Sequence, residues 1–356
     1  MIKLGDFQVN REQRKIIKDI LDSGRITEGK YVKLFEEELA KFLGVKHAIA
    51  VTNGTVALQL LSQYFGKSKK VCIPAMTFPA TINAFETTGQ NTMLCDIGED
   101  LQINIDSLTE TQKKSIDILV PVHLMGYTSN MEHIMREAKK YGWIVIEDTA
   151  EAFGAKIGDK YTGTFGNFGT FSFYVSHNII GGELGAIVTN DNNVNEILRS
   201  MKNHGRTGSN LKFEHSYIGS NYKTTEFCTG IAYENILNAN KILNKRFLNA
   251  LYFQDNINNP KLYGYSIDLG FSPLGYPIKA KTEEIKKEIT SKLKEEGIET
   301  RNIFPCLANQ KAYEGRFNTN DYPVANKMEK LIFYIGVHQF LKRGDLNKIV
   351  KVLNDF

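Results

Sequence analysis

The chain has 356 residues, of which 42% are hydrophobic and 24% charged, with 29 glycines and only 8 prolines. This composition predicts a folded protein of about two domains and excludes disordered, collagen-like and repeat architectures. The formal net charge of +4 favours neither nucleic acid nor a membrane as partner. We find no secretory leader and no apolar run of about 20 residues, so we expect a cytoplasmic protein. The four cysteines lie far apart, without metal-ligand spacing, and predict no metal site.

Short β-rich runs alternate with helical patterns in the first part of the chain, at residues 47–52, 71–74, 91–96, 116–124 and 143–148. Such alternation predicts a parallel sheet with crossover helices. Two later runs, at 169–176 and 185–190, predict a hairpin in the same sheet. After about residue 235 the chain becomes rich in Lys and Asn, and we expect a large domain over residues 1–235 and a smaller one over 236–356.

Three loops that follow predicted strands carry residues suited to chemistry. Gly54 and Thr55, at a helix start, leave room for a phosphate, although taken alone this segment is more typical of an ordinary N-cap and turn. Asp148 ends an apolar strand and suits either a protonated heterocyclic nitrogen or a helix cap. His177 lies in a Gly-rich loop, where it is either a reactive group or an ordinary surface or core histidine.

All three loops occur in order within a longer similarity. The chain resembles the nucleotide-sugar aminotransferases of the aspartate-aminotransferase fold type, which use pyridoxal 5′-phosphate (PLP). The similarity is carried by RITEGKYVKLFEEELAKFLGVKHAIAVTNGTVAL, VCIPAMTFPATINAF, PVHLMGYTSNMEHIMREAKKYGWIVIEDTAEAFGA, GTFGNFGTFSFY, NHGR and GIETR. It implies PLP fold type I: an α/β large domain with a mostly parallel seven-stranded sheet between helices, and a smaller C-terminal α+β domain.

The resemblance also implies roles for single residues. Around the cofactor, these are phosphate contacts from Gly54, Thr55 and Ser172, ring stacking by Phe78, a ring-nitrogen carboxylate at Asp148, and Glu151 near the phenolic oxygen. Asn221 would reach the phosphate of the neighbouring subunit, which implies a homodimer with shared active sites. His204 and Arg301 are candidate substrate contacts, although a helix C-cap explains His204 and a surface ion pair explains Arg301 equally well.

One position departs from the family pattern. The lysine that links PLP covalently normally stands in a Lys-Asn pair, whereas this chain has His177-Asn178, and an imidazole cannot form that link. Histidine at this position is typical of the sugar 3-dehydratases, which remove the C3 hydroxyl of nucleotide-linked 4-keto-6-deoxyhexoses. Ser176, Glu151 and residues 335–339 also resemble the enzymes that act on GDP-4-keto-6-deoxymannose.

This branch implies that pyridoxamine 5′-phosphate (PMP) is the reactive form of the cofactor, with His177 moving protons and glutamate as amino donor. Two alternatives stay open on the sequence. One is an aminotransferase whose lysine has been changed to His177, and the other is a catalytically silent homologue that binds the cofactor.

Overall fold

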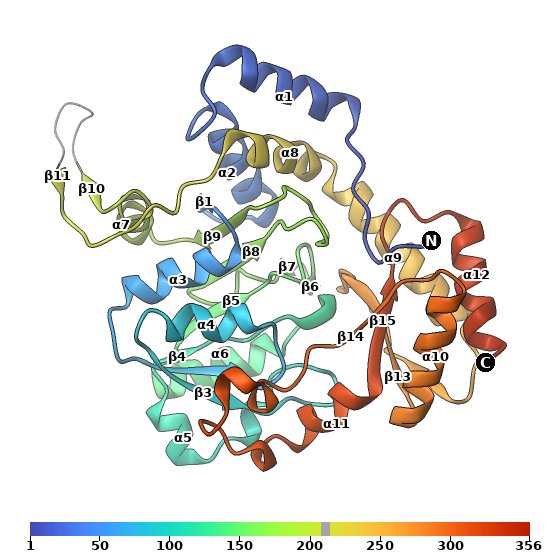
Figure 1. Ribbon diagram of the computed structural model, residues 1–356. Coiled ribbons are helices and arrows are strands. Elements are labelled where there is room, and N and C mark those ends of the chain that lie inside the picture. The colour runs from blue at the N-terminus through green and yellow to red at the C-terminus, as the bar shows by residue number, and fades with distance from the viewer. Residues whose placement is uncertain (208–213) are drawn as a thin grey trace.

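A seven-stranded sheet forms the centre of the larger part of the chain, in a computed structural model that describes residues 1–207 and 214–356 (Figure 1). The strand order is β1-β9-β8-β5-β4-β2-β3, and only the pairings of β9 with its two neighbours are antiparallel. In that order the strands are β1 (His47–Val51), β9 (Gly185–Thr189), β8 (Phe168–Ser172), β5 (Ile144–Asp148), β4 (Ile118–Leu119), β2 (Lys70–Pro74) and β3 (Asn91–Cys95). The mostly parallel α/β sheet expected from the sequence is confirmed.

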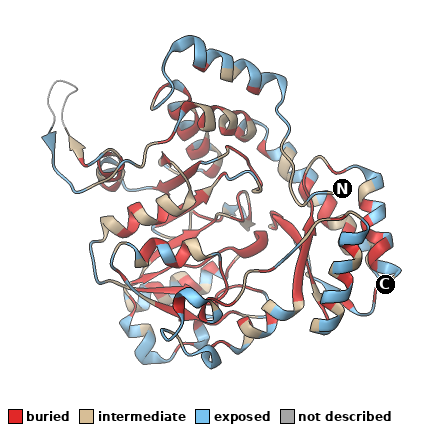
Figure 2. Cartoon of the chain, in the orientation of Figure 1, coloured by how far each residue is buried: buried red, intermediate tan, exposed pale blue. Residues whose placement is uncertain are grey.

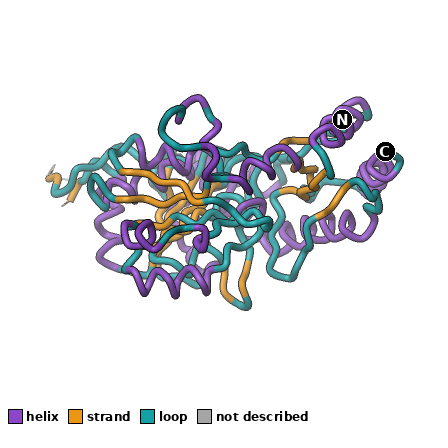
Figure 3. The backbone as a smooth tube through the Cα atoms, turned by 90° about the horizontal axis from the view of Figure 1, so that it is seen from below, coloured by secondary structure: helices purple, strands orange, loops and turns teal. Residues whose placement is uncertain are grey.

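Helices cover both faces of this sheet, because its strands carry apolar side chains on both sides. One face packs against α3 (Gly54–Tyr64), α4 (Pro79–Glu86) and α7 (Asn192–Lys202). The opposite face packs against α2 (Lys30–Leu43), α6 (Met131–Tyr141) and α8 (Glu226–Leu237). Figure 3 shows strands between layers of helices, and most of the sheet is buried in Figure 2.

The predicted hairpin is confirmed, since β8 pairs with β9 in antiparallel register. The run at 116–124 gives a much shorter strand than its apolar length suggests, because β4 holds only two residues. Pro121 interrupts the ladder, having no amide hydrogen to donate. Its carbonyl still accepts from the Asp148 amide at 2.9 Å, and Val122 forms an isolated bridge to Asp148.

A second, antiparallel sheet near the C-terminus has the order β12-β13-β15-β14. Its strands are β12 (Leu262–Gly264), β13 (Gly275–Ala280), β15 (Ile332–Gly336) and β14 (Thr300–Asn302). One face packs against α9 (Ala239–Asn256), α10 (Glu283–Glu295) and α12 (Arg343–Asn354). Alternate β15 residues, Ile332 and Tyr334, belong to the core cluster of the larger sheet. The small sheet therefore lies between its own helices and the large core.

The domain boundary between residues 235 and 236 stays a prediction. This point lies in the last turn of α8, and other segments of the chain also cross between the two cores. The Ile2 amide donates to the Gly297 carbonyl at 2.7 Å, which places the N-terminal segment on the C-terminal part. Conversely, Cys306, Leu307 and Tyr313 pack into the core of the larger sheet.

The remaining elements connect or flank the two sheets. They are the helices α1 (Arg11–Ser23), α5 (Glu110–Ser115) and α11 (Pro323–Leu331), the strand pairs β6 (Lys156–Ile157) with β7 (Lys160–Tyr161) and β10 (Arg206–Thr207) with β11 (Glu214–His215), and the 3₁₀ turns η1 (Ile105–Ser107), η2 (Leu124–Gly126), η3 (Leu307–Asn309), η4 (Lys311–Tyr313) and η5 (Thr319–Asp321). Within the described ranges, no helix has the length and apolar character needed to cross a bilayer.

Candidate active site

A cavity of about 450 Å³ opens where the loops after β1, β2, β5 and β8 meet. The carboxyl ends of parallel strands share one edge of a sheet, which is where such folds bind ligands. Of the ten residues given a candidate role from the sequence, eight line this cavity, namely Gly54, Thr55, Phe78, Asp148, Glu151, Ser172, His177 and Arg301. His204 and Asn221 are not among its lining residues.

One end of the cavity is built by the N-terminus of α3. The Asn53 side chain caps the helix by accepting from the Val56 amide at 2.9 Å. The first helical amides have no partner within the helix, and the helix dipole favours an anion beside them. A Cβ on Gly54 would lie 2.9 Å from the Ser172 Cβ, so only glycine lets β8 approach this closely. This crowded cradle fits a phosphate group.

Asp148 forms the floor of the cavity and is 6% exposed. It accepts from the Thr81 hydroxyl at 2.9 Å and from the Ala150 amide at 3.2 Å. Burial raises the pKa of Asp148 above its ordinary value, and these two hydrogen bonds only partly offset the rise. A buried carboxylate in this state is stabilised by a cationic partner, so it fits the protonated ring nitrogen of PLP.

An aromatic side chain lies at the mouth of the same cavity. Phe78 is 57% exposed and its ring lies 5.5 Å from the ring of Phe304. A large exposed aromatic group on a cavity wall offers its face to a flat ligand. Together with the cradle and Asp148, it completes a set of contacts that fits the phosphate, the ring nitrogen and the ring face of PLP.

Glu151 is a second buried carboxyl group in the cavity wall. Its Oε2 accepts from the Met125 amide at 2.9 Å. Burial raises its pKa from the ordinary 4.5 to about 7, with the negative charge of Asp148 adding to the rise. Around neutral pH this side chain therefore exists in both its neutral and its charged form, so it is able to donate or to accept a hydrogen bond.

His177 is partly buried in the wall of the cavity, and its tautomer follows from one contact. Its Nδ1 lies 3.1 Å from the Ser172 carbonyl oxygen. A carbonyl oxygen only accepts, so Nδ1 carries the proton of the neutral ring and Nε2 keeps a free lone pair. Burial lowers the pKa of His177 from 6.5 to about 4. The neutral imidazole is thus an oriented proton acceptor.

No lysine is found among the described residues that line the cavity. Lys202, at the end of α7, is buried elsewhere, with its Nζ 3.1 Å from a Glu28 carboxylate oxygen. His204 is exposed in a left-handed turn with φ of 62°. Asn221 is exposed and bridges to Asn203. The structure therefore separates the last two from the other predicted site residues.

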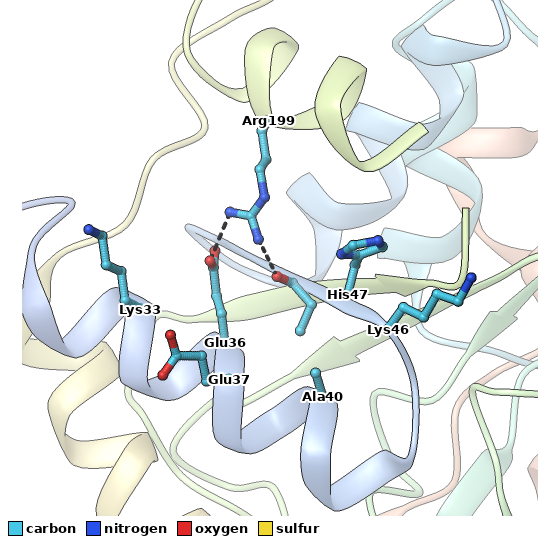
Figure 4. Close-up of a pocket in the computed structure, with 8 residues that line it drawn as sticks. Lys33, Glu36, Glu37, Ala40, Lys46, His47 and Arg199 are labelled. Atoms are coloured by element: carbon cyan, nitrogen blue, oxygen red, sulfur yellow. Dashed lines mark hydrogen bonds and ion pairs between the residues drawn. The ribbon is translucent and has the colours of Figure 1, made fainter. Parts of the chain in front are cut away.

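The described part of the protein has two further hollows of smaller volume. One, of about 280 Å³, adjoins it and shares Ser176, Leu274, Arg301 and Tyr334 with its wall. The other, of about 290 Å³, is a surface hollow between α2, β1 and α7 (Figure 4). There the Arg199 guanidinium donates to Glu36 and to the Ala48 carbonyl, each at 2.8 Å. These groups satisfy one another, so this hollow is explained by structural pairing.

Two residues of the site, Thr81 and Glu183, carried no recognisable signal in the sequence. Thr81 becomes a partner of Asp148 only because α4 begins beside β5. Glu183 lines the cavity rim as an exposed carboxylate, on the loop that also carries His177. Behind the site, His123 Nε2 donates to the buried Glu147 at 3.0 Å, because its Nδ1 already accepts from the Ser129 amide. A side-chain pattern that depends on such distant contacts has no local signature.

Comparison with known proteins identifies the family. The DegT/DnrJ/EryC1/StrS aminotransferase family matches residues 8–354. The chain is 31% identical to GDP-perosamine synthase of Escherichia coli O157:H7 over 89% of its length and 88% of the relative. It is 30% identical to GDP-4-keto-6-deoxy-D-mannose 3-dehydratase of Escherichia coli O55:H7 over 95% and 96% of the two chains.

A solved structure supports the cofactor. The Escherichia coli GDP-4-keto-6-deoxy-D-mannose 3-dehydratase with bound hydrated PLP superposes with a TM-score of 0.91 at 26% identity, covering 99% of both chains. The fold is therefore that of PLP fold type I, as the sequence predicts. The contacts described above fit the same cofactor. The chain thus belongs to the DegT/DnrJ/EryC1/StrS family of PLP-dependent sugar aminotransferases and related enzymes, and its cofactor is pyridoxal 5′-phosphate.

Proposed function

We propose that the chain is a PLP/PMP-dependent 3-dehydratase, which removes the C3 hydroxyl of a nucleotide-linked 4-keto-6-deoxyhexose in deoxysugar biosynthesis. The observation that carries this proposal is His177, which stands where the family has its lysine and presents a free Nε2 to the cavity. The resemblance to the dehydratases of GDP-4-keto-6-deoxymannose makes that sugar nucleotide the first substrate to test. Glutamate is proposed as the amino donor on the same resemblance.

The residues of the cavity divide the work. When bound as PMP, the cofactor supplies an amine for the C4 ketone and an electron sink in its pyridinium ring. The N-terminus of α3 holds the phosphate, and Asp148 keeps the ring nitrogen protonated. His177 Nε2 accepts a proton and returns it to the departing hydroxide, because an imidazole with a low pKa releases its proton readily. Glu151 is proposed to lie near the phenolic oxygen of the cofactor, and its pKa of about 7 lets it exchange a proton near neutral pH.

Histidine favours loss of the hydroxyl for a structural reason. A lysine would hold the cofactor covalently and would carry its protons on a long flexible chain. The His177 ring is instead fixed by the Ser172 carbonyl and has one free nitrogen. A proton taken by Nε2 stays at that place until it is passed to the leaving group.

We infer a homodimer with shared sites. Asn221 lies outside the cavity of its own subunit, on an exposed segment. The Thr52 amide donates to the Tyr222 carbonyl at 3.1 Å, which holds this segment beside the phosphate cradle. This placement suits contact with the phosphate of a second subunit. Arg301 and His204 are proposed substrate contacts, of which only Arg301 lies at the cavity of its own chain.

An aminotransferase is the second candidate function. It is favoured by the 31% identity to GDP-perosamine synthase and by Asn178, which matches the family's Lys-Asn pair. The two functions differ in their product, since dehydration removes an oxygen and transamination adds an amine.

The deciding experiment uses the purified protein with PLP, glutamate and a panel of nucleotide-linked 4-keto-6-deoxyhexoses. Mass spectrometry should find the mass of a 3,6-dideoxy-4-ketosugar. A 4-amino sugar would instead establish the aminotransferase, and no product from any member of the panel would overturn the proposed activity. The His177→Asn variant is the control, and it should yield no deoxygenated product.

A further inference from the structure

A buried cation lies behind the wall of the active site. Arg246, on α9, is 2% exposed. Its Nε donates to the Pro273 carbonyl at 3.0 Å and its Nη2 to the Leu274 carbonyl at 2.8 Å, while Nη1 lies 3.4 Å from the Gln339 side-chain oxygen. Across the described part of the chain, no carboxylate is within ion-pair distance of this guanidinium. A buried charge bound only by neutral groups is costly, which calls for an explanation.

The carbonyls that Arg246 holds belong to a short segment, residues 272–274, that contacts both sides of the site. The Asn178 side-chain amide donates to the Ser272 carbonyl at 2.9 Å and to its hydroxyl at 3.0 Å. Asn178 directly follows His177. Leu274 itself lines the cavity. The segment therefore joins the α9 cation to the loop that carries the imidazole.

The same segment also supports Glu151. The Ser272 amide donates to the Gly126 carbonyl at 3.2 Å, and the Leu274 amide to the Met125 carbonyl at 3.4 Å. Met125 in turn donates its amide to Glu151. A Cβ on Gly126 would lie only 2.0 Å from the Ser272 carbonyl oxygen, so the approach requires glycine. Segment 272–274 thus supports both Glu151 and the loop that carries His177.

We propose that Arg246 is a positioning residue for His177, acting through segment 272–274 and Asn178, and that its unpaired charge adds to the effect of burial in disfavouring the charged imidazole. The guanidinium fork holds two successive carbonyls, which a single ammonium cannot match. A fixed cation nearby also disfavours protonation of the ring. The catalytic consequence rests on the proposed function, whereas the placement and the charge effect do not.

Other titratable or charged groups line the cavity together with His177. From its own loop these are Tyr174, whose ring contacts the imidazole, and Glu183, and from the other walls Asp148, Glu151, Arg301 and Tyr334. Loss of hydration on burial is the largest cause of the low pKa of His177, with the positive charge of Arg246 lowering it further. The acids act in the opposite direction, so removal of the Arg246 cation should produce a measurable rise.

The test uses cofactor-free protein with isotope-labelled histidine, and His177→Asn assigns the signal. The titration runs from pH 8 down to about pH 3, and in the parent protein the His177 signal should change only below pH 5. Arg246→Met should move its midpoint upward by about half a pH unit or more. Arg246→Lys keeps the charge and should leave the midpoint low. The matched control is Arg199→Met, which removes another arginine that binds a carbonyl, in the surface hollow between α2, β1 and α7. It should leave the midpoint of His177 unchanged.

An unchanged midpoint in folded Arg246→Met would overturn the charge effect. Asn178→Ala tests the positioning independently, since it cuts the link to segment 272–274 and leaves Arg246 intact. It should lower kcat for the sugar reaction at least tenfold, with KM for the sugar nucleotide nearly unchanged. An unchanged kcat would overturn the positioning role. If the product is an amino sugar, the proposed dehydration fails, while the titration result on cofactor-free protein still stands or falls by itself.

Discussion

Two groups on the wall of one cavity, Glu151 and His177, should make opposite contributions to the pH dependence of stability in the cofactor-free protein. Folding raises the pKa of Glu151 from 4.5 to about 7 and lowers that of His177 from 6.5 to about 4, mainly because burial disfavours each charged form. Each pH unit between folded and unfolded pKa corresponds to about 1.4 kcal/mol. Each group therefore changes the free energy of unfolding by about 3 kcal/mol across its window.

The signs follow from proton binding. Between pH 4.5 and 7 folded Glu151 keeps a proton that the unfolded chain has lost, so its contribution to stability falls as pH rises. Between pH 4 and 6.5 the unfolded chain binds a proton at His177 that the folded protein does not, so that contribution rises with pH. In the parent protein the two slopes nearly cancel where the windows overlap. They become visible only when one group is removed.

The perturbations are Glu151→Gln and His177→Asn, each compared with the parent across pH 4 to 8. Urea unfolding is followed by the fluorescence of Trp143, the only tryptophan, which is buried. The difference in unfolding free energy, variant minus parent, should rise with pH for Glu151→Gln and fall with pH for His177→Asn. Glu183→Gln, at an exposed carboxylate on the same cavity rim, is the control and should give a flat difference. Two difference curves of the same sign, or two flat ones, would refute this account of the site.

Three further predictions concern the loaded enzyme. Asp148→Asn keeps the shape of the side chain but loses the charge that stabilises the ring nitrogen, so the sugar reaction should slow by about 10²- to 10³-fold. The cofactor-free protein should stay at least as stable, because a costly buried carboxylate is gone. Single-turnover rates within threefold of the parent would contradict the assignment. His177→Lys should attach the cofactor covalently, as detected by mass spectrometry after borohydride reduction, and should abolish dehydration; dehydration at the parental rate would remove His177 from the mechanism. Mixing inactive His177→Ala and Asn221→Asp subunits should restore activity, since one site of each mixed dimer is then intact; absence of recovery after verified subunit exchange would place Asn221 outside the partner's site.

The sequence predicted those parts of the fold that depend on local pattern. Alternating apolar runs predicted the strands, and a tight Gly-containing stretch predicted the β8 and β9 hairpin, because both signals lie within a few residues of what they determine. The short β4 was missed, although Pro121 within the run is the physical reason and was visible. The pairing of Ile2 with Gly297 was not predictable, since the two residues lie far apart in the sequence and no local pattern marks their contact.

The candidate site shows the same division. Resemblance placed eight residues that the structure brings to one cavity. Seven of them lie at or after the carboxyl ends of strands of the large sheet, whereas Arg301 comes from β14 of the small sheet. The protonation state of His177 required the structure, since it depends on the Ser172 carbonyl, five residues away across a turn. The role of Thr81 beside Asp148 likewise arises from a contact between the first turn of α4 and the last residue of β5, which are distant in the sequence.

The change of the family lysine to histidine that we propose at position 177 is compatible with this fold, because the residues proposed to support the cofactor do not depend on the covalent link. The proposed phosphate cradle, ring-nitrogen carboxylate and stacking ring come from the loops after β1, β2 and β5 and from Ser172, the last residue of β8, whereas His177 lies on the loop that follows Ser172. That loop keeps its anchor at Asn178. A lysine side chain is long and flexible, whereas the short imidazole is held in one orientation by its hydrogen bond to the Ser172 carbonyl. A substitution at this position therefore exchanges a tether for an oriented base and leaves the binding of the cofactor to the remaining walls.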